Sequence, residues 1–136
     1  MSAPAAERAA VRAFEVHFLP AACRVRHMRQ ITAAHLRLWH LTALVDTATL
    51  AVSELVTNSI RHGEGHPVGL RVTCSAHELR IAVTDGCPTP ARLRSADDTA
   101  ESGRGLLLIA FFTKDWGVSP DGLTTWCAFA IPARRP

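Results

Sequence analysis

The spacing of apolar residues in the first half of the chain predicts one strand followed by two amphipathic helices. Apolar and polar positions alternate over residues 12–19, which is typical of a strand with one buried face, and Pro20 ends it. Over residues 21–39 the apolar positions recur every three or four residues, so we expect a helix with the buried stripe Val25, Met28, Ile31 or Thr32, His35 and Leu38. A second helix is predicted over residues 42–62, before the stop signal Gly63, with the stripe Val45, Ala48, Val52, Leu55, Val56 and Ile60.

In the second half of the chain the pattern predicts a hairpin, a long loop, a short helix and a last pair of strands. Alternating positions predict four strands, over residues 68–74, 79–85, 116–119 and 123–131. Residues 86–104 contain Gly, Pro and small polar residues without an apolar period, which is typical of a lid or binding loop, and a short apolar helix is expected over residues 105–114. The order is therefore β-α-α-β-β-α-β-β. Because most strands are expected to be antiparallel and the helices come in blocks, this order predicts an α+β two-layer sandwich.

Composition places the chain among globular proteins with a hydrophobic core. Of its 136 residues, 48% are hydrophobic and 20% are charged, which excludes a disordered, collagen-like or disulfide-stapled chain. We expect a flexible tail at residues 1–11 and a single domain at residues 12–136. The thiols of Cys23, Cys74 and Cys127 and the indole of Trp126 are expected in its core.

The charge of the chain and its lack of targeting signals indicate its expected cellular location and the expected classes of partner. The sequence shows no secretory leader, and no apolar run approaches the roughly eighteen residues that span a bilayer, so we expect a cytoplasmic protein without a membrane partner. The net charge is only +3 and no Lys/Arg-rich run occurs, so we expect no direct nucleic-acid partner. The arginines at the start of the first predicted helix form either a partner surface or a solvated face: Arg24, Arg26 and Arg29.

Three short segments carry residues suited to chemistry. Polar residues at a spacing of four share one edge of the second predicted helix: Glu54, Asn58 and His62, with Arg61 beside them. Asp85-Gly86 ends a predicted strand, and residues 103–106 (Gly-Arg-Gly-Leu) begin the short helix, where glycines let backbone N–H groups approach an anion. Taken singly, these segments are also typical of a solvated helix face, a strand exit and a helix entry.

Together and in this order, the segments resemble the boxes of the GHKL (Bergerat-fold) ATPases. Residues 54–62 resemble the N box, Asp85-Gly86 the first glycine box and residues 103–106 the second, and the resemblance covers residues 12–131. The segments are most similar to the small bacterial anti-sigma-factor serine/threonine kinases and to stand-alone histidine-kinase-like ATP-binding regulatory proteins. The resemblance implies the Bergerat two-layer fold and a site for ATP or ADP.

The resemblance also implies a role for each matched residue. Asn58 would hold Mg²⁺ through its side-chain oxygen, and Glu54 would be the catalytic general base. Asp85 would accept a hydrogen bond from the adenine amino group. The other nucleotide-binding positions that the resemblance implies are Arg61, His62, Gly86, Gly103, Arg104, Gly105, Leu106 and Thr124, the last of which would support Asp85.

For function, the resemblance implies a kinase that uses Mg-ATP to phosphorylate an anti-sigma-factor antagonist in trans, with a sigma factor as a second partner and a role in transcription regulation. Two departures from the family pattern favour an alternative: Cys87 stands for a Ser and Leu123 for a Lys. That alternative is a nucleotide-gated module that sequesters a sigma factor or an antagonist with little turnover.

Three further questions stay open at this point. One is whether the chain is a plain α+β interaction domain that binds no nucleotide. Another is whether the domain forms a homodimer. A metal site at His62, Glu64 and His66 is a weaker interpretation than the N box, because two glycines between these residues give no rigid face.

Overall fold

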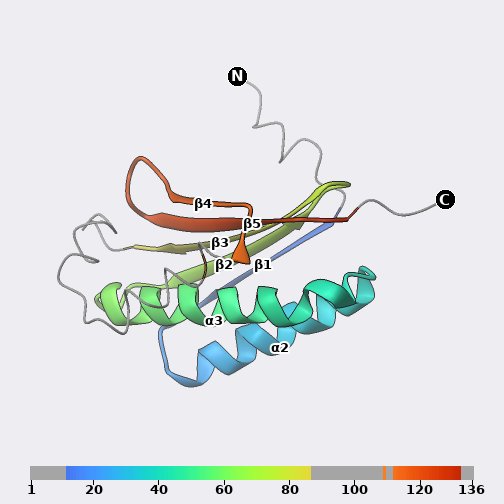
Figure 1. The fold of residues 1–136 in the computed structure, drawn as a ribbon. Helices are drawn as coiled ribbons and strands as arrows, with labels where there is room; N and C mark the ends of the chain where they lie inside the picture. Colours follow the sequence, from blue (N-terminus) through green and yellow to red (C-terminus); the bar gives the residue numbers. More distant parts are fainter. Residues whose placement is uncertain (1–11, 87–108, 110–111, 133–136) are drawn as a thin grey trace.

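The computed structural model describes residues 12–86, 109 and 112–132, which form a five-stranded sheet with two helices packed on one face (Figure 1). In chain order the elements are β1 (Arg12–Phe18), α2 (Cys23–Leu38), the 3-10 helix η1 (Thr42–Leu44), α3 (Val45–His62), β2 (Val68–Cys74), β3 (Glu78–Asp85), β4 (Asp115–Val118) and β5 (Thr124–Ala130). The predicted α+β sandwich is confirmed. The expected tail at residues 1–11 and all of the expected loop except Gly86 lie outside the described residues.

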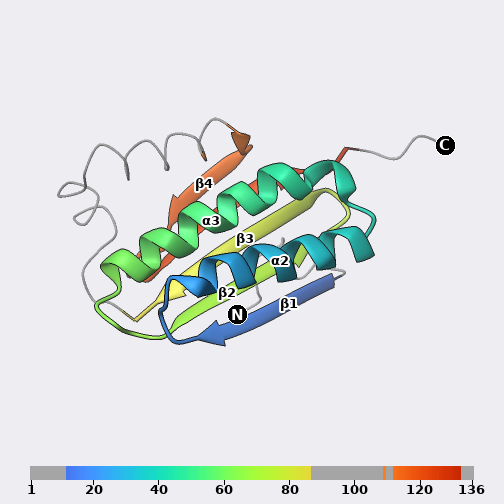
Figure 2. The same cartoon turned by 90° about the horizontal axis from the view of Figure 1, so that it is seen from below.

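The sheet is antiparallel throughout, with strand order β1-β2-β3-β5-β4. Residues paired across strands, such as Val72 with Ile81 and Ile81 with Cys127, point to the same face. Figure 2 shows α2 and α3 side by side against this inner face, with α2 nearer β1 and β2 and α3 over β3. Because successive residues of a strand point in opposite directions, each strand also presents a second set of side chains on the outer face, away from the helices.

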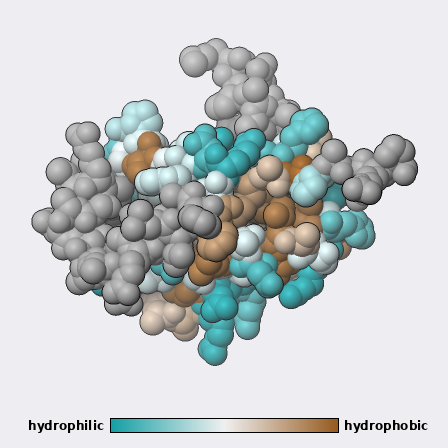
Figure 3. All heavy atoms as spheres, viewed as in Figure 1, coloured by the Kyte–Doolittle hydropathy of each residue, from teal (hydrophilic) through white to brown (hydrophobic). Residues whose placement is uncertain are grey.

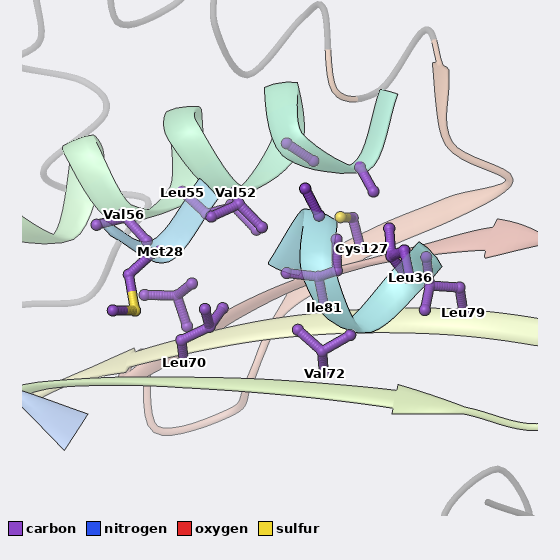
Figure 4. Packing of buried hydrophobic residues seen from close by; sticks show 14 of the residues in the cluster. Met28, Leu36, Val52, Leu55, Val56, Leu70, Val72, Leu79, Ile81 and Cys127 are labelled. Carbon is purple, nitrogen blue, oxygen red and sulfur yellow. The ribbon is translucent and has the colours of Figure 1, made fainter. Parts of the chain in front are cut away.

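The core lies between the inner face and the two helices (Figure 4). Leu55 and Val56 of α3 and Leu70 and Ile81 of the sheet are all at most 1% exposed. Removing a side chain of this size from water contributes about 1.5–3 kcal/mol to folding. The apolar stripe of α3 therefore holds this helix at a defined position on β2 and β3.

The stripe of the first helix differs from its prediction at the last turn. Leu38 was expected in the core but is 71% exposed, and Leu36 is buried in its place. An α-helix has about 3.6 residues per turn, so three turns from Val25 end near residue 36, whereas steps of mostly three residues reach 38. The helix therefore turns Leu38 toward solvent.

Two other side chains expected in the core lie elsewhere. Cys23 is exposed at the first turn of α2. Trp126 lies half-buried on the outer face, where the Arg80 guanidinium carbon is 4.2 Å from the ring centroid and Gly117 leaves room for the indole. Trp39, at 8% exposed, is the tryptophan that packs in the core.

The other two expected core thiols, Cys74 and Cys127, are buried as predicted. Burial raises the pKa of Cys127 to about 12, partly offset by the charge of Arg80, so this thiol stays protonated near neutral pH. Near the predicted short helix, Ile109 and Phe112 are helical, and the Thr113 N–H donates to the Ile109 carbonyl at 3.0 Å.

The helix layer stops short of β4, the strand at the front of Figure 1. The strand register turns Trp116 and Val118 to the inner face, yet they are 41% and 37% exposed. Figure 3 shows apolar residues among the polar ones on the side of the molecule that carries this strand. Neither α2 nor α3, the two long helices among the described residues, combines the length and the hydropathy needed to cross a bilayer.

The core contacts predict unequal effects for two leucines. We expect Leu55→Ala to lower the free energy of unfolding by about 2–5 kcal/mol, because it leaves a cavity under α3. Leu38→Ala is the matched control, and we expect it to change that free energy by no more than about 0.5 kcal/mol. Urea denaturation followed by circular dichroism measures both, and equal losses would contradict this placement of the core.

Candidate nucleotide site

The C-terminal half of α3 carries the polar edge that the sequence predicts. Glu54, Asn58 and His62 are half-buried and Arg61 is exposed, while the adjacent side of the same turns buries Leu55 and other core residues. With a rise of about 1.5 Å per residue, Glu54 and His62 lie about 12 Å apart along the helix axis. The helix therefore presents a carboxylate, an amide, a guanidinium and an imidazole in one row, at the border of the core.

This row ends directly against the end of β3. A methyl group added at Gly63, the residue that follows α3, would lie 3.5 Å from Asp85 Cβ and 2.5 Å from the Ser59 carbonyl oxygen. The φ angle of Gly63 is −81°, so this glycine does not serve as a left-handed helix stop. An added side chain would clash with the Ser59 carbonyl oxygen inside the last turn of α3, whereas its distance to Asp85 is an ordinary contact, so Gly63 is required by the close of the helix and also lies beside Asp85.

Asp85 is a buried carboxylate held in place by the sheet. It is 3% exposed, and its backbone N–H donates to the Leu123 carbonyl at 3.0 Å. The neighbouring Gly86 lies so close to His66 that an added methyl group would be 3.0 Å from His66 Cβ. The end of α3, the segment that follows it and the start of β5 therefore converge on the predicted adenine-binding aspartate.

The structure does not place Thr124 behind Asp85, as the resemblance implied. Thr124 is paired with Thr84, and the two hydroxyl oxygens are 2.7 Å apart on the outer face of the sheet. Asp85 follows Thr84 along β3, so its side chain points to the inner face. Thr125 pairs with Val83 on that inner face and is 7% exposed, which makes it the threonine on the same side as Asp85.

The structure describes some of the predicted site residues and not others. Within the described part of the chain, the polar edge of α3 ends close to the Asp85-Gly86 segment at the end of β3. Four predicted site residues lie outside the described residues: Gly103, Arg104, Gly105 and Leu106. Cys87, one of the two departures from the family pattern, lies outside them as well. Their placement is not described, so their predicted roles stay predictions.

The described residues form no metal centre from protein side chains alone. They contain no group of three or more His, Cys, Asp or Glu side chains that could hold a metal ion, and His62, Glu64 and His66 are all among them. The geometry therefore gives no support to a metal site at these three residues. A magnesium ion bound mainly by phosphates and water needs only one or two protein oxygens, and the Asn58 amide offers one.

The fold is that of a nucleotide-binding domain of the ATPase type. A family model described as a histidine kinase-like ATPase domain matches residues 18–129, from the last residue of β1 into β5. Because the match takes in most of the chain, the chain belongs to the histidine kinase-like ATPase domain family, within the GHKL type of ATPase. A search of the curated proteins found no match.

The register of β5 predicts different effects for the two adjacent threonines. We expect Thr125→Val to lower ATP affinity about tenfold, because it removes a hydroxyl on the face that Asp85 occupies. Thr124→Val removes a hydroxyl from the outer face, and we expect ATP affinity within about twofold of the unmodified protein. Isothermal titration calorimetry with ATP measures both. A loss in Thr124→Val alone would return the supporting role to Thr124.

Proposed function

We propose that this protein is an ATP-dependent serine/threonine kinase of the anti-sigma-factor type, which phosphorylates an antagonist protein in trans. The observation that carries the proposal is the row on α3: a carboxylate at Glu54 lies one turn before an amide at Asn58, on a helix whose end contacts Asp85. Membership of the histidine kinase-like ATPase family supports the nucleotide. The similarity of residues 54–62 and 103–106 to the anti-sigma-factor kinases supports the kind of acceptor.

At the base end of the site, Asp85 would select adenine. An ionised carboxylate only accepts hydrogen bonds, and the adenine amino group donates one. Guanine has a carbonyl oxygen at the equivalent position, so it would face the carboxylate with a second acceptor. Because Asp85 is 3% exposed, a mismatch there would leave polar groups buried without partners, which is the arrangement that discriminates most strongly.

At the phosphate end of the site, Asn58 and Glu54 would have separate roles. The Asn58 oxygen would hold Mg²⁺, which when bound neutralises charge on the phosphates and orients them. Glu54 lies one turn earlier, about 6 Å away on the same edge. No hydrogen bond or ion pair engages its carboxylate within the described part of the chain, so it is available to accept the proton of an attacking serine or threonine hydroxyl.

A second candidate function is a nucleotide-gated binding module with little turnover. The observation that favours it is Leu123, which stands where the similar kinases usually carry a lysine. Leu123 lies opposite Asp85 at the start of β5 and contributes its backbone carbonyl to the Asp85 N–H. A leucine side chain supplies no charge and no hydrogen bond to a phosphate or to a partner, so this position favours binding over transfer.

Nucleotide binding is tested first, by calorimetric titration with ATP and GTP, with and without Mg²⁺. We expect binding of ATP over GTP, a loss of about 10- to 100-fold in Asp85→Asn, and a loss of Mg²⁺ dependence in Asn58→Ala. Thr124→Val serves as the control for a change of similar size on the outer face. An Asp85→Asn protein that binds ATP as tightly as the unmodified protein would contradict the adenine assignment.

Phosphoryl transfer is tested separately, with γ-labelled ATP and a panel of antagonist domains as acceptors. We expect Glu54→Gln to lower the transfer rate by about 10²- to 10⁴-fold while ATP still binds, because it removes the base and keeps the shape. Unchanged transfer in Glu54→Gln would remove Glu54 from the role of base. Tight ATP binding without transfer to any acceptor would favour the binding module.

A further inference from the structure

An arginine-lined groove lies between α2 and α3, the two helices that Figure 2 shows side by side. The groove has a volume of about 460 Å³. One wall comes from α2 and the other from the first turns of α3, and buried Ala33 and Val45 form its apolar floor. The polar residues that line it are Arg26, Arg29, Gln30, Arg37, Asp46 and Thr49.

The arginines of this groove follow one edge of α2. Arg26, Arg29 and Arg37 are separated by three and eight residues, and Ala33 lies between the last two, so the positions repeat at helical spacing. From Arg26 to Arg37 the helix rises about 16 Å, at about 1.5 Å per residue. The α2 wall is therefore a row of positive charge about as long as three turns of helix.

These guanidinium groups have free hydrogen-bonding capacity. All three arginines are exposed, and among the described residues no hydrogen bond or ion pair within 4.0 Å engages any of them. Asp46 lines the same groove but forms no ion pair with them. Three cations thus face one anion here, although the whole chain carries 15 Lys and Arg against 12 Asp and Glu. An isolated surface cation needs no explanation, but an unneutralised row along a groove is suited to an anionic ligand.

The walls and the floor together point to a peptide as this ligand. A peptide can direct carboxylates to the α2 wall, a hydrogen-bond donor to Asp46 and apolar side chains to Ala33 and Val45. The backbone of a nucleic acid repeats a negative charge at every phosphate and carries no N–H donor, so a phosphate beside Asp46 would be repelled, whereas a peptide can place a backbone N–H there. Guanidinium groups bind carboxylates through paired N–H groups, which suits glutamate and aspartate side chains.

We propose that the groove between α2 and α3 is a docking surface for an acidic segment of a partner protein, with Arg26, Arg29 and Arg37 as its contacts. The groove is separate from the nucleotide site, because Asp46 and Asn58 lie twelve residues apart on α3, about 18 Å along the axis. The docking surface rests on the proposed function, to which it adds a site for the partner protein. Loss of docking is expected to leave ATP binding unchanged, so the two sites can be tested separately.

The probe for this surface is a fluorescein-labelled acidic peptide of about eleven residues, the length of helix that spans 16 Å, with glutamates on one face and leucines on the other. Binding is followed by fluorescence anisotropy with the full chain. We expect the Arg26→Glu/Arg29→Glu double variant to bind the peptide at least about tenfold more weakly, and Arg37→Glu to show a loss in the same direction. Arg71→Glu is the matched control, since Arg71 is an exposed arginine on the outer face of the sheet, and its affinity should stay within about twofold.

Four results would overturn the proposal: no binding of the acidic peptide, an equal affinity for its glutamine counterpart, equal losses in the Arg71→Glu control, or tighter arginine-dependent binding of single-stranded oligothymidine. Circular dichroism melts confirm that each variant is folded. ATP titration of the double variant separates the two sites, because we expect its ATP affinity to match that of the unmodified protein.

Discussion

The contact between α3 and the inner face of β2 and β3 is the constraint on which the rest of the structure depends. Leu55 and Val56 bury one side of this helix against Leu70 and Ile81, and the same turns carry Glu54 and Asn58 on a neighbouring edge. A helix cannot move one side without the other. The free energy that buries the apolar stripe therefore also places the polar row, and these polar residues need no separate scaffold.

At the C-terminal end of α3, the helix and the end of β3 lie close together. Gly63, the residue after α3, lies beside Asp85, and the Asp85 N–H donates to the carbonyl of Leu123, the residue before β5. The site thus depends on a backbone approach between segments that are more than twenty residues apart in the chain.

The two surfaces proposed for ligands use opposite ends of α3. Residues 54–62 carry the polar edge proposed for the nucleotide, whereas Asp46 and Thr49 line the arginine groove with α2. One continuous helix of 18 residues connects them, and its core side is packed along most of its length. A protein that binds a nucleotide and a partner protein needs two such surfaces. In these proposals α3 contributes residues to both.

The sequence by itself determined the fold class, the order of the described elements and the edge shared by Glu54, Asn58 and His62, because alternation and helical spacing are local properties of the chain. It did not determine which of Thr124 and Thr125 lies beside Asp85, since a shift of one position in strand pairing turns a side chain to the other face. The burial of Trp39 rather than Trp126 and the position of Gly63 beside Asp85 were also decided by the tertiary structure. Each depends on what packs against a residue from a distant segment, and that information is absent from the local pattern.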